Sequence, residues 1–173
     1  MTNEFDYIIK DGEVFLNNKI KKINIGIKNG KIEKIFINSK KYDAKKTISA
    51  KNKWVFPGVV DIHFHIRAPA FPKRGTVLSE TKAAAKGGVT TLLEMPISDP
   101  CASTPEIVKQ RKKHFSKNSF INFGLIAALG KLNENNINGL IKEGAIAFKI
   151  FTIAPPPNRS SEFDGLCFVK EGE

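Results

Sequence analysis

The sequence of 173 residues has little cysteine and no long apolar run, and each shortage excludes a class of protein. Its two cysteines, Cys101 and Cys167, are too few for a disulfide framework, so we expect a reducing, cytoplasmic setting. No apolar run approaches the roughly 18 residues that a membrane-spanning helix needs. The first residues, MTNEFDYIIKDGEVF, lack the basic and then apolar order of a signal peptide. We therefore expect a globular protein with no membrane partner.

Negative charge is scarce: the chain has 28 basic and only 17 acidic residues, which gives a net charge of +11. Such a balance invites a nucleic-acid interpretation, but the lysines are spread along the chain among Asn and Ile residues. No arginine-rich tract and no row of interleaved aromatic residues accompanies them. We therefore expect no nucleic-acid partner.

The first 56 residues are typical of a small β-rich domain, which we expect to form a sandwich segment. Short β-prone runs alternate with turn signals, and the dipeptides Asp11-Gly12 and Asn29-Gly30 each predict a hairpin. Pro57-Gly58 closes this region. The domain boundary is therefore expected between residues 56 and 57.

Residues 57–173 alternate between strand and helix patterns, which predicts parallel βαβ units. The predicted strands are residues 59–66, 90–95, 121–129 and 145–151, and the predicted helices are residues 77–88, 104–118 and 133–144. Gly87-Gly88 signals a helix end, and Thr104-Pro105 signals a helix start. The period of roughly 28 residues matches a (β/α)8 barrel, of which about four units fit.

The run VVDIHFHIRAP at residues 59–69 carries the candidate chemistry. Strand side chains alternate, so Asp61, His63, His65 and Arg67 share one face, opposite Ile62, Phe64 and Ile66. Two neutral imidazoles at i and i+2 can bind one divalent metal ion, and Asp61 is placed to orient a histidine. The alternative is a pair of histidines satisfied by hydrogen bonds near a strand end.

The fourth predicted strand, AIAFKIF, places a lysine on the inward face of an apolar strand. Ile146, Phe148 and Ile150 are expected against the helices, so Lys149 is expected to point into the barrel. Burial disfavours the ammonium and favours a neutral amine, which can react with carbon dioxide to form a carbamate that bridges metal ions. The same pattern also fits a lysine whose aliphatic chain packs against apolar side chains while its ammonium group extends to the end of the strand.

The segments FPGVVDIHFHIRAP, AAAKGGVTTLLEMP and GAIAFKIF resemble the dihydroorotase, hydantoinase and allantoinase branch of the amidohydrolase superfamily. The resemblance implies an α/β fold, the first half of a metal-dependent (β/α)8 TIM-type barrel preceded by a small β-sandwich segment. It implies zinc, dinuclear in the complete fold, with His63 and His65 as ligands and Lys149 as the carboxylated bridging ligand. The implied reaction is hydrolysis of a cyclic amide or ureide.

Departures from the family pattern leave the substrate open. Arg67 matches the arginine that holds a substrate carboxylate in dihydroorotases, and its planar fork suits that task. The asparagine common after Met-Pro is replaced by Ile97, with Ser98 as the expected substitute donor. The choice among dihydroorotate, allantoin, hydantoins and another ureide therefore remains open, with Arg67 alone favouring a carboxylate.

Family members continue for several hundred residues, with two further zinc-binding histidines and a catalytic aspartate on later strands. We therefore expect a partial chain that holds no catalytic base, is inactive by itself and belongs to a homo-oligomer when complete. The alternative is a non-catalytic remnant that acts in assembly or binding. His114 is expected on the surface, Cys101 as a buried or incidental thiol, and Glu94 as a structural residue facing the barrel interior.

Overall fold

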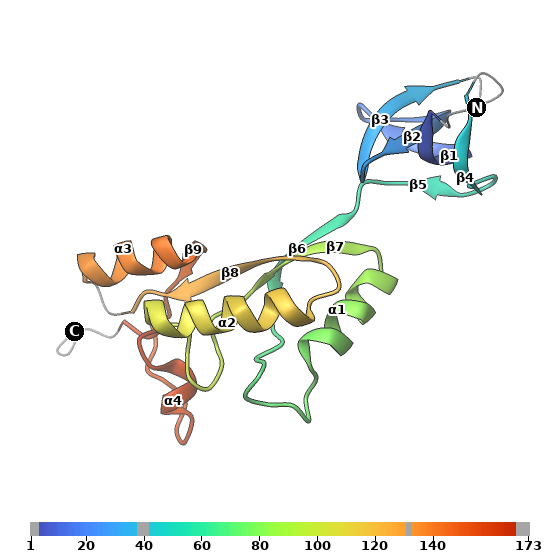
Figure 1. The fold of residues 1–173 in the computed structure, drawn as a ribbon. Helices are drawn as coiled ribbons and strands as arrows, with labels where there is room; N and C mark the ends of the chain where they lie inside the picture. Colours follow the sequence, from blue (N-terminus) through green and yellow to red (C-terminus); the bar gives the residue numbers. More distant parts are fainter. Residues whose placement is uncertain (1–3, 38–41, 131–132, 169–173) are drawn as a thin grey trace. The chain divides into compact units, whose positions relative to one another are not determined.

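The structure is a computed structural model that describes residues 4–37, 42–130 and 133–168. The chain divides into two compact units, Met1–Pro57 and Gly58–Glu173 (Figure 1). In the part of the chain that the structure describes, no helix combines the length and the apolar character needed to cross a membrane.

The first unit consists of β-strands, and the five that the structure describes belong to one sheet. The strands are β1 (Phe5–Leu16), β2 (Lys19–Lys28), β3 (Lys31–Phe36), β4 (Ala44–Ser49) and β5 (Trp54–Val55). Their order is β3-β2-β1-β4, and β5 also pairs with β1. The hairpin predicted at Asn29-Gly30 is confirmed, because both residues have positive φ between antiparallel β2 and β3.

The hairpin predicted at Asp11-Gly12 is wrong, because β1 continues through this dipeptide. The pairing of β1 with β2 shifts register between Ile9 and Gly12, and Asp11 has a φ of 62°. Asp11 N–H donates to Asn24 Oδ1 at 2.9 Å, so the dipeptide forms a β-bulge held by the neighbouring strand. The turn lies instead at Asn17-Asn18, where both residues have positive φ.

The second unit alternates strands and helices, and its four strands are parallel in the order β6-β7-β8-β9. The strands are β6 (Val59–Phe64), β7 (Val89–Glu94), β8 (Asn122–Ala128) and β9 (Ala145–Lys149). The helices are α1 (Val77–Lys86), α2 (Pro105–Asn118), α3 (Glu134–Glu143) and the short α4 (Ser160–Phe163). The predicted βα order is therefore confirmed, with each element ending within a few residues of its expected limit. Helix α4 lies beyond β9, where no helix is predicted, and residues 169–173 lie outside the described residues.

Local capping explains where the long helices begin and end. The Thr76 side chain accepts from Ser79 N–H at the start of α1, and Thr104 with Pro105 starts α2 as predicted. Helix α1 ends before Gly87-Gly88, as its glycines predict. Helix α3 ends at Gly144 in the left-handed conformation, with a φ of 101°, which glycine adopts without strain.

One face of the parallel sheet packs against the helices. Its core joins strand residues such as Leu92 and Leu125 to helix residues such as Val77, Phe115 and Leu140. Ile62 and Ile146, which were expected on this face, are 67% and 59% exposed. The pairing of β6 with β7 shifts register between Asp61 and Phe64, and the pairing of β8 with β9 shifts between Leu125 and Ile126. Each shift interrupts the regular alternation of side chains from which the expectation was drawn.

Candidate active site

The two histidines of the VVDIHFHIRAP run lie at the carboxyl end of β6 with their rings together. His63 Nε2 and His65 Nε2 are 3.2 Å apart, and the ring centroids are 5.1 Å apart. Asp61 Oδ1 accepts a hydrogen bond from the backbone N–H of His63 at 2.9 Å. Asp61 therefore fixes the backbone of the first histidine, whereas we expected it to orient an imidazole.

Lys149, at the end of β9, reaches the same point from the opposite edge of the sheet. Its Nζ lies 3.5 Å from His63 Nε2 and 3.6 Å from Met95 Sδ. Neighbouring strands lie roughly 4.8 Å apart, so the first and fourth strands of a flat sheet would be roughly 14 Å apart. The contact therefore requires the sheet to curve, with His63 and Lys149 on its concave face. The structure thus brings all three predicted metal ligands together.

The protonation of this cluster suits metal binding. Partial burial and, next, the positive charge of Arg67 together lower the pKa of His65 from 6.5 to about 4. Burial also lowers the pKa of Lys149 below its ordinary value. A neutral imidazole offers a lone pair to a cation, and a neutral amine is a nucleophile.

The spacing of the imidazole nitrogens also fits a zinc ion. Two nitrogens bound to one tetrahedral zinc at about 2.0–2.1 Å lie roughly 3.3 Å apart, close to the 3.2 Å between His63 Nε2 and His65 Nε2. Among the described residues, no group of three or more His, Cys, Asp or Glu side chains is arranged to hold a metal ion. The described part of the site therefore offers two imidazoles and one lysine, short of a closed zinc centre.

Arg67 leaves the strand in a left-handed backbone conformation, with a φ of 60°. Its Nη1 donates to Glu162 Oε2 at 3.0 Å, and Glu162 also accepts two bonds from Arg159. Sequence reasoning missed Glu162, because it follows Arg67 by 95 residues and lies in a polar tail without strand or helix periodicity. The guanidinium assigned to a substrate is thus already paired with a carboxylate.

Ser98, the other predicted substrate contact, is buried beside Arg67. Its Oγ donates to the carbonyl oxygen of Arg67 at 2.9 Å. In this structure Ser98 therefore supports the unusual backbone of Arg67. A direct bond from Ser98 to a substrate stays a prediction.

A buried ion pair fixes the turn that follows the histidines. The Glu94 carboxylate is almost fully buried and accepts the backbone N–H groups of Ile66 and Arg67, each at 2.9 Å. Arg111 of α2 donates to the same carboxylate at 2.9 Å and to the Pro96 carbonyl at 3.1 Å. Burial raises the pKa of Glu94, whereas the charge of Arg111 opposes that rise. Glu94 therefore faces the helices, and the expectation that it faces the barrel interior is wrong.

The sequence did contain a signal for this pair. Val108, Arg111 and Phe115 follow one another at helical spacing on the buried face of α2. An arginine in such a series requires a buried acidic partner, and Glu94 shares the parity of the core residue Leu92.

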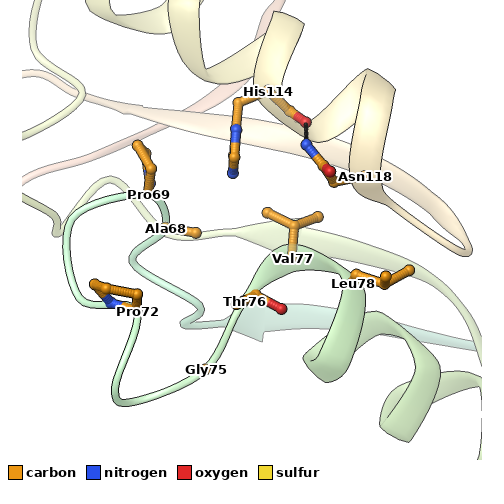
Figure 2. A pocket seen from close by; sticks show the side chains of 9 residues that line it. All are labelled: Ala68, Pro69, Pro72, Gly75, Thr76, Val77, Leu78, His114 and Asn118. Atoms are coloured by element: carbon orange, nitrogen blue, oxygen red, sulfur yellow. Dashed lines mark hydrogen bonds between the residues drawn. The ribbon is translucent and has the colours of Figure 1, made fainter.

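A separate cavity of about 330 Å³ lies between the segment that follows β6 and helices α1 and α2 (Figure 2). It is lined by Ala68, Pro69, Pro72, Gly75, Thr76, Val77, Leu78, His114 and Asn118. His114 is half-buried there and is not the surface residue that was expected. Figure 2 shows Asn118 bonded to the backbone of His114, where Nδ2 donates to the carbonyl oxygen at 2.8 Å. His63, His65 and Lys149 are not part of this lining, so the candidate active site lies elsewhere.

Cys101 is fully buried in a small apolar cluster with Ile97 and Leu166. Burial raises the pKa of its thiol to about 12. A thiol that stays protonated is a poor metal ligand, so Cys101 is a packing residue, as expected.

Comparison with known proteins places these features in a family. A family model described as dihydro-orotase-like matches residues 52–151. L-hydantoinase of Paenarthrobacter aurescens is 32% identical over 98% of this chain and 36% of the relative. An allantoinase of Escherichia coli is 34% identical over 85% of this chain and 32% of the relative. The chain thus spans about a third of the length of these curated relatives.

Solved structures confirm the predicted fold class. An L-hydantoinase (dihydropyrimidinase) from Arthrobacter aurescens matches with a TM-score of 0.83 and 32% identity, over 90% of this chain and 35% of that one. A D-hydantoinase matches with a TM-score of 0.72 and 28% identity, over 89% of this chain and 34% of that one. Since the family model covers more than half of the residues, this chain belongs to the dihydro-orotase-like family.

Proposed function

We propose that this chain forms one wall of the active site of a zinc-dependent hydrolase that cleaves the C–N bond of a cyclic amide or ureide. The observation that carries the proposal is the approach of His63 Nε2, His65 Nε2 and Lys149 Nζ at the carboxyl ends of β6 and β9. Catalytic groups of barrels of this type lie at that end of the strands. The similarity to L-hydantoinase and allantoinase supports a ring-opening reaction.

His63 and His65 would hold zinc through their Nε2 atoms, and Lys149, once carboxylated, would be a further zinc ligand. Zinc supplies Lewis-acid chemistry, since it polarises a carbonyl group and lowers the pKa of water. The protein contributes a neutral imidazole at His65, because its lowered pKa keeps that ring unprotonated.

Lys149 would act as a carboxylate after reaction with carbon dioxide. The neutral amine attacks the carbon of carbon dioxide, a nitrogen–carbon bond forms, and one proton leaves to solvent. The product is an anion beside His63, whose Nε2 lies 3.5 Å from Lys149 Nζ. The lowered pKa of Lys149 supports this step, because only the neutral amine is nucleophilic.

Arg67 and Ser98 complete the wall on the substrate side. The guanidinium of Arg67 would donate to an oxygen atom of the ring substrate. Ser98 fixes the backbone of Arg67 through its hydrogen bond to the carbonyl oxygen. Removing the Ser98 hydroxyl should therefore make the position of Arg67 less well defined.

Zinc content tests the metal assignment directly. Replacing both His63 and His65 with alanine should abolish zinc binding, measured by elemental analysis of protein dialysed against zinc. His114→Ala is the matched control, because this histidine lies in the separate cavity of Figure 2. Full zinc content in the double variant would refute the assignment.

A hybrid enzyme tests the reaction. This chain would replace the matching 36% of L-hydantoinase, so that the remainder of that enzyme supplies the rest of the site. We expect zinc-dependent opening of a hydantoin, which is lost in the His63→Ala/His65→Ala hybrid. A folded, zinc-containing hybrid that opens no cyclic amide would support the non-catalytic alternative.

A further inference from the structure

Glu162 joins two arginines beside the candidate active site. Its carboxylate accepts from Arg67 Nη1 at 3.0 Å, from Arg159 Nε at 2.7 Å and from Arg159 Nη2 at 2.8 Å. The side chain of Glu162 is only 9% exposed, against 21% for Arg67 and 36% for Arg159. Glu162 is therefore the buried centre of the group, and Arg159 is its solvent-facing member.

Aromatic contacts connect this group to the proposed zinc ligands. Lys149 Nζ lies 4.9 Å from the ring centroid of Phe151, whose ring is 5.6 Å from that of Phe163 in α4. The guanidinium of Arg159 lies 5.1 Å from the Phe163 ring. The segment that carries Glu162 is thus packed onto Phe151, two residues beyond Lys149 at the end of β9.

We propose that Glu162 determines which ring substrates the site selects. By neutralising Arg67, it makes the site accept an uncharged ring and disfavour a ring that bears a carboxylate. This inference rests on the proposed function and names the substrate class of the same site. Glu162 is a positioning residue, because it acts through Arg67.

The physical reason is competition for one guanidinium. A carboxylate on the substrate would approach Arg67 with the Glu162 carboxylate already bonded to it, and the two carboxylates would repel each other across that guanidinium. The solvent-facing charge of Arg159 is screened and already directed at Glu162. An uncharged carbonyl oxygen meets no such repulsion and can still accept from the N–H groups of Arg67 that are not bonded to Glu162, such as those of Nη2.

Two compounds that differ only by a carboxylate group give the test: dihydroorotate carries it, and dihydrouracil is the same ring without it. Binding of each to the zinc-free 173-residue chain would be measured by nuclear magnetic resonance titration, so that no ring opening interferes. We expect dihydroorotate to bind no more tightly than dihydrouracil. In Glu162→Gln, dihydroorotate should bind at least about tenfold more tightly, with dihydrouracil unchanged.

Three further variants separate the charge effect from a structural effect. Glu162→Asp retains the negative charge and should restore the original preference. Glu134→Gln removes an equal charge from exposed α3 and should change neither affinity. Adding Arg67→Met to Glu162→Gln should abolish the gain.

An unchanged ratio in Glu162→Gln, or no detectable binding of dihydroorotate to it, would overturn the inference. A changed ratio together with an inactive hybrid enzyme would overturn the proposed reaction and leave the role of Glu162 intact.

Discussion

His65 makes the stability of the chain depend on pH in a predictable direction. Its pKa falls from 6.5 to about 4 on folding, chiefly through burial, so the unfolded state takes up a proton first as the pH falls. The contribution of His65 is fully present above pH 6.5 and is lost progressively as the pH falls toward about 4. Urea unfolding followed by circular dichroism at several pH values should show this loss. His65→Gln should flatten the curve over that range, and an equal slope in the variant would contradict the assignment.

Lys149 offers a second prediction for a single side chain. Lys149→Ala should lower zinc content, because it removes the proposed bridging anion, whereas the exposed Lys142→Ala in α3 should not. Short carboxylic acids such as propionate should restore part of the zinc content by occupying the vacated space. An unmodified ammonium on Lys149 in a zinc-loaded crystal structure would contradict the carbamate.

Among the elements, the ion pair between β7 and α2 offers the sharpest test. Arg111→Met leaves the buried Glu94 carboxylate without its charged partner, so the free energy of unfolding should fall by about 3–5 kcal/mol. Lys109→Met, on the exposed side of the same helix, should change it by less than about 0.5 kcal/mol. Urea unfolding measures both values. A loss of similar size in the two variants would show that the pair does not hold the elements together.

The same elements show what strand alternation can and cannot predict. Alternation placed His63, His65 and Lys149 on one side of the sheet, and their side chains do meet. It failed for Ile62 and Ile146, because register shifts between paired strands leave no mark in the sequence of either strand.

Long-range pairing explains the other failures. Glu162 meets Arg67 only after the chain has passed through three strands and three helices. The Asp11-Gly12 dipeptide fits a hairpin turn locally, yet its bond to Asn24 of β2 makes it a bulge. Each outcome depends on a residue in another element, which local sequence patterns do not contain.

For the whole molecule, we predict that the 173-residue polypeptide alone opens no cyclic amide. Within the described sheet, β6 and β9 are edge strands, and Val59, Ile62 and Ile146 expose apolar surface. His63 and Lys149 lie at the ends of β6 and β9, and His65 directly follows β6, so the proposed zinc coordination would be incomplete with these ligands alone. We therefore expect self-association in size-exclusion chromatography with light scattering, and no ring opening of dihydroorotate, allantoin or hydantoin. A zinc-dependent monomer that turns over at about 1 per second or faster would contradict both expectations, because it would need a complete site within these residues.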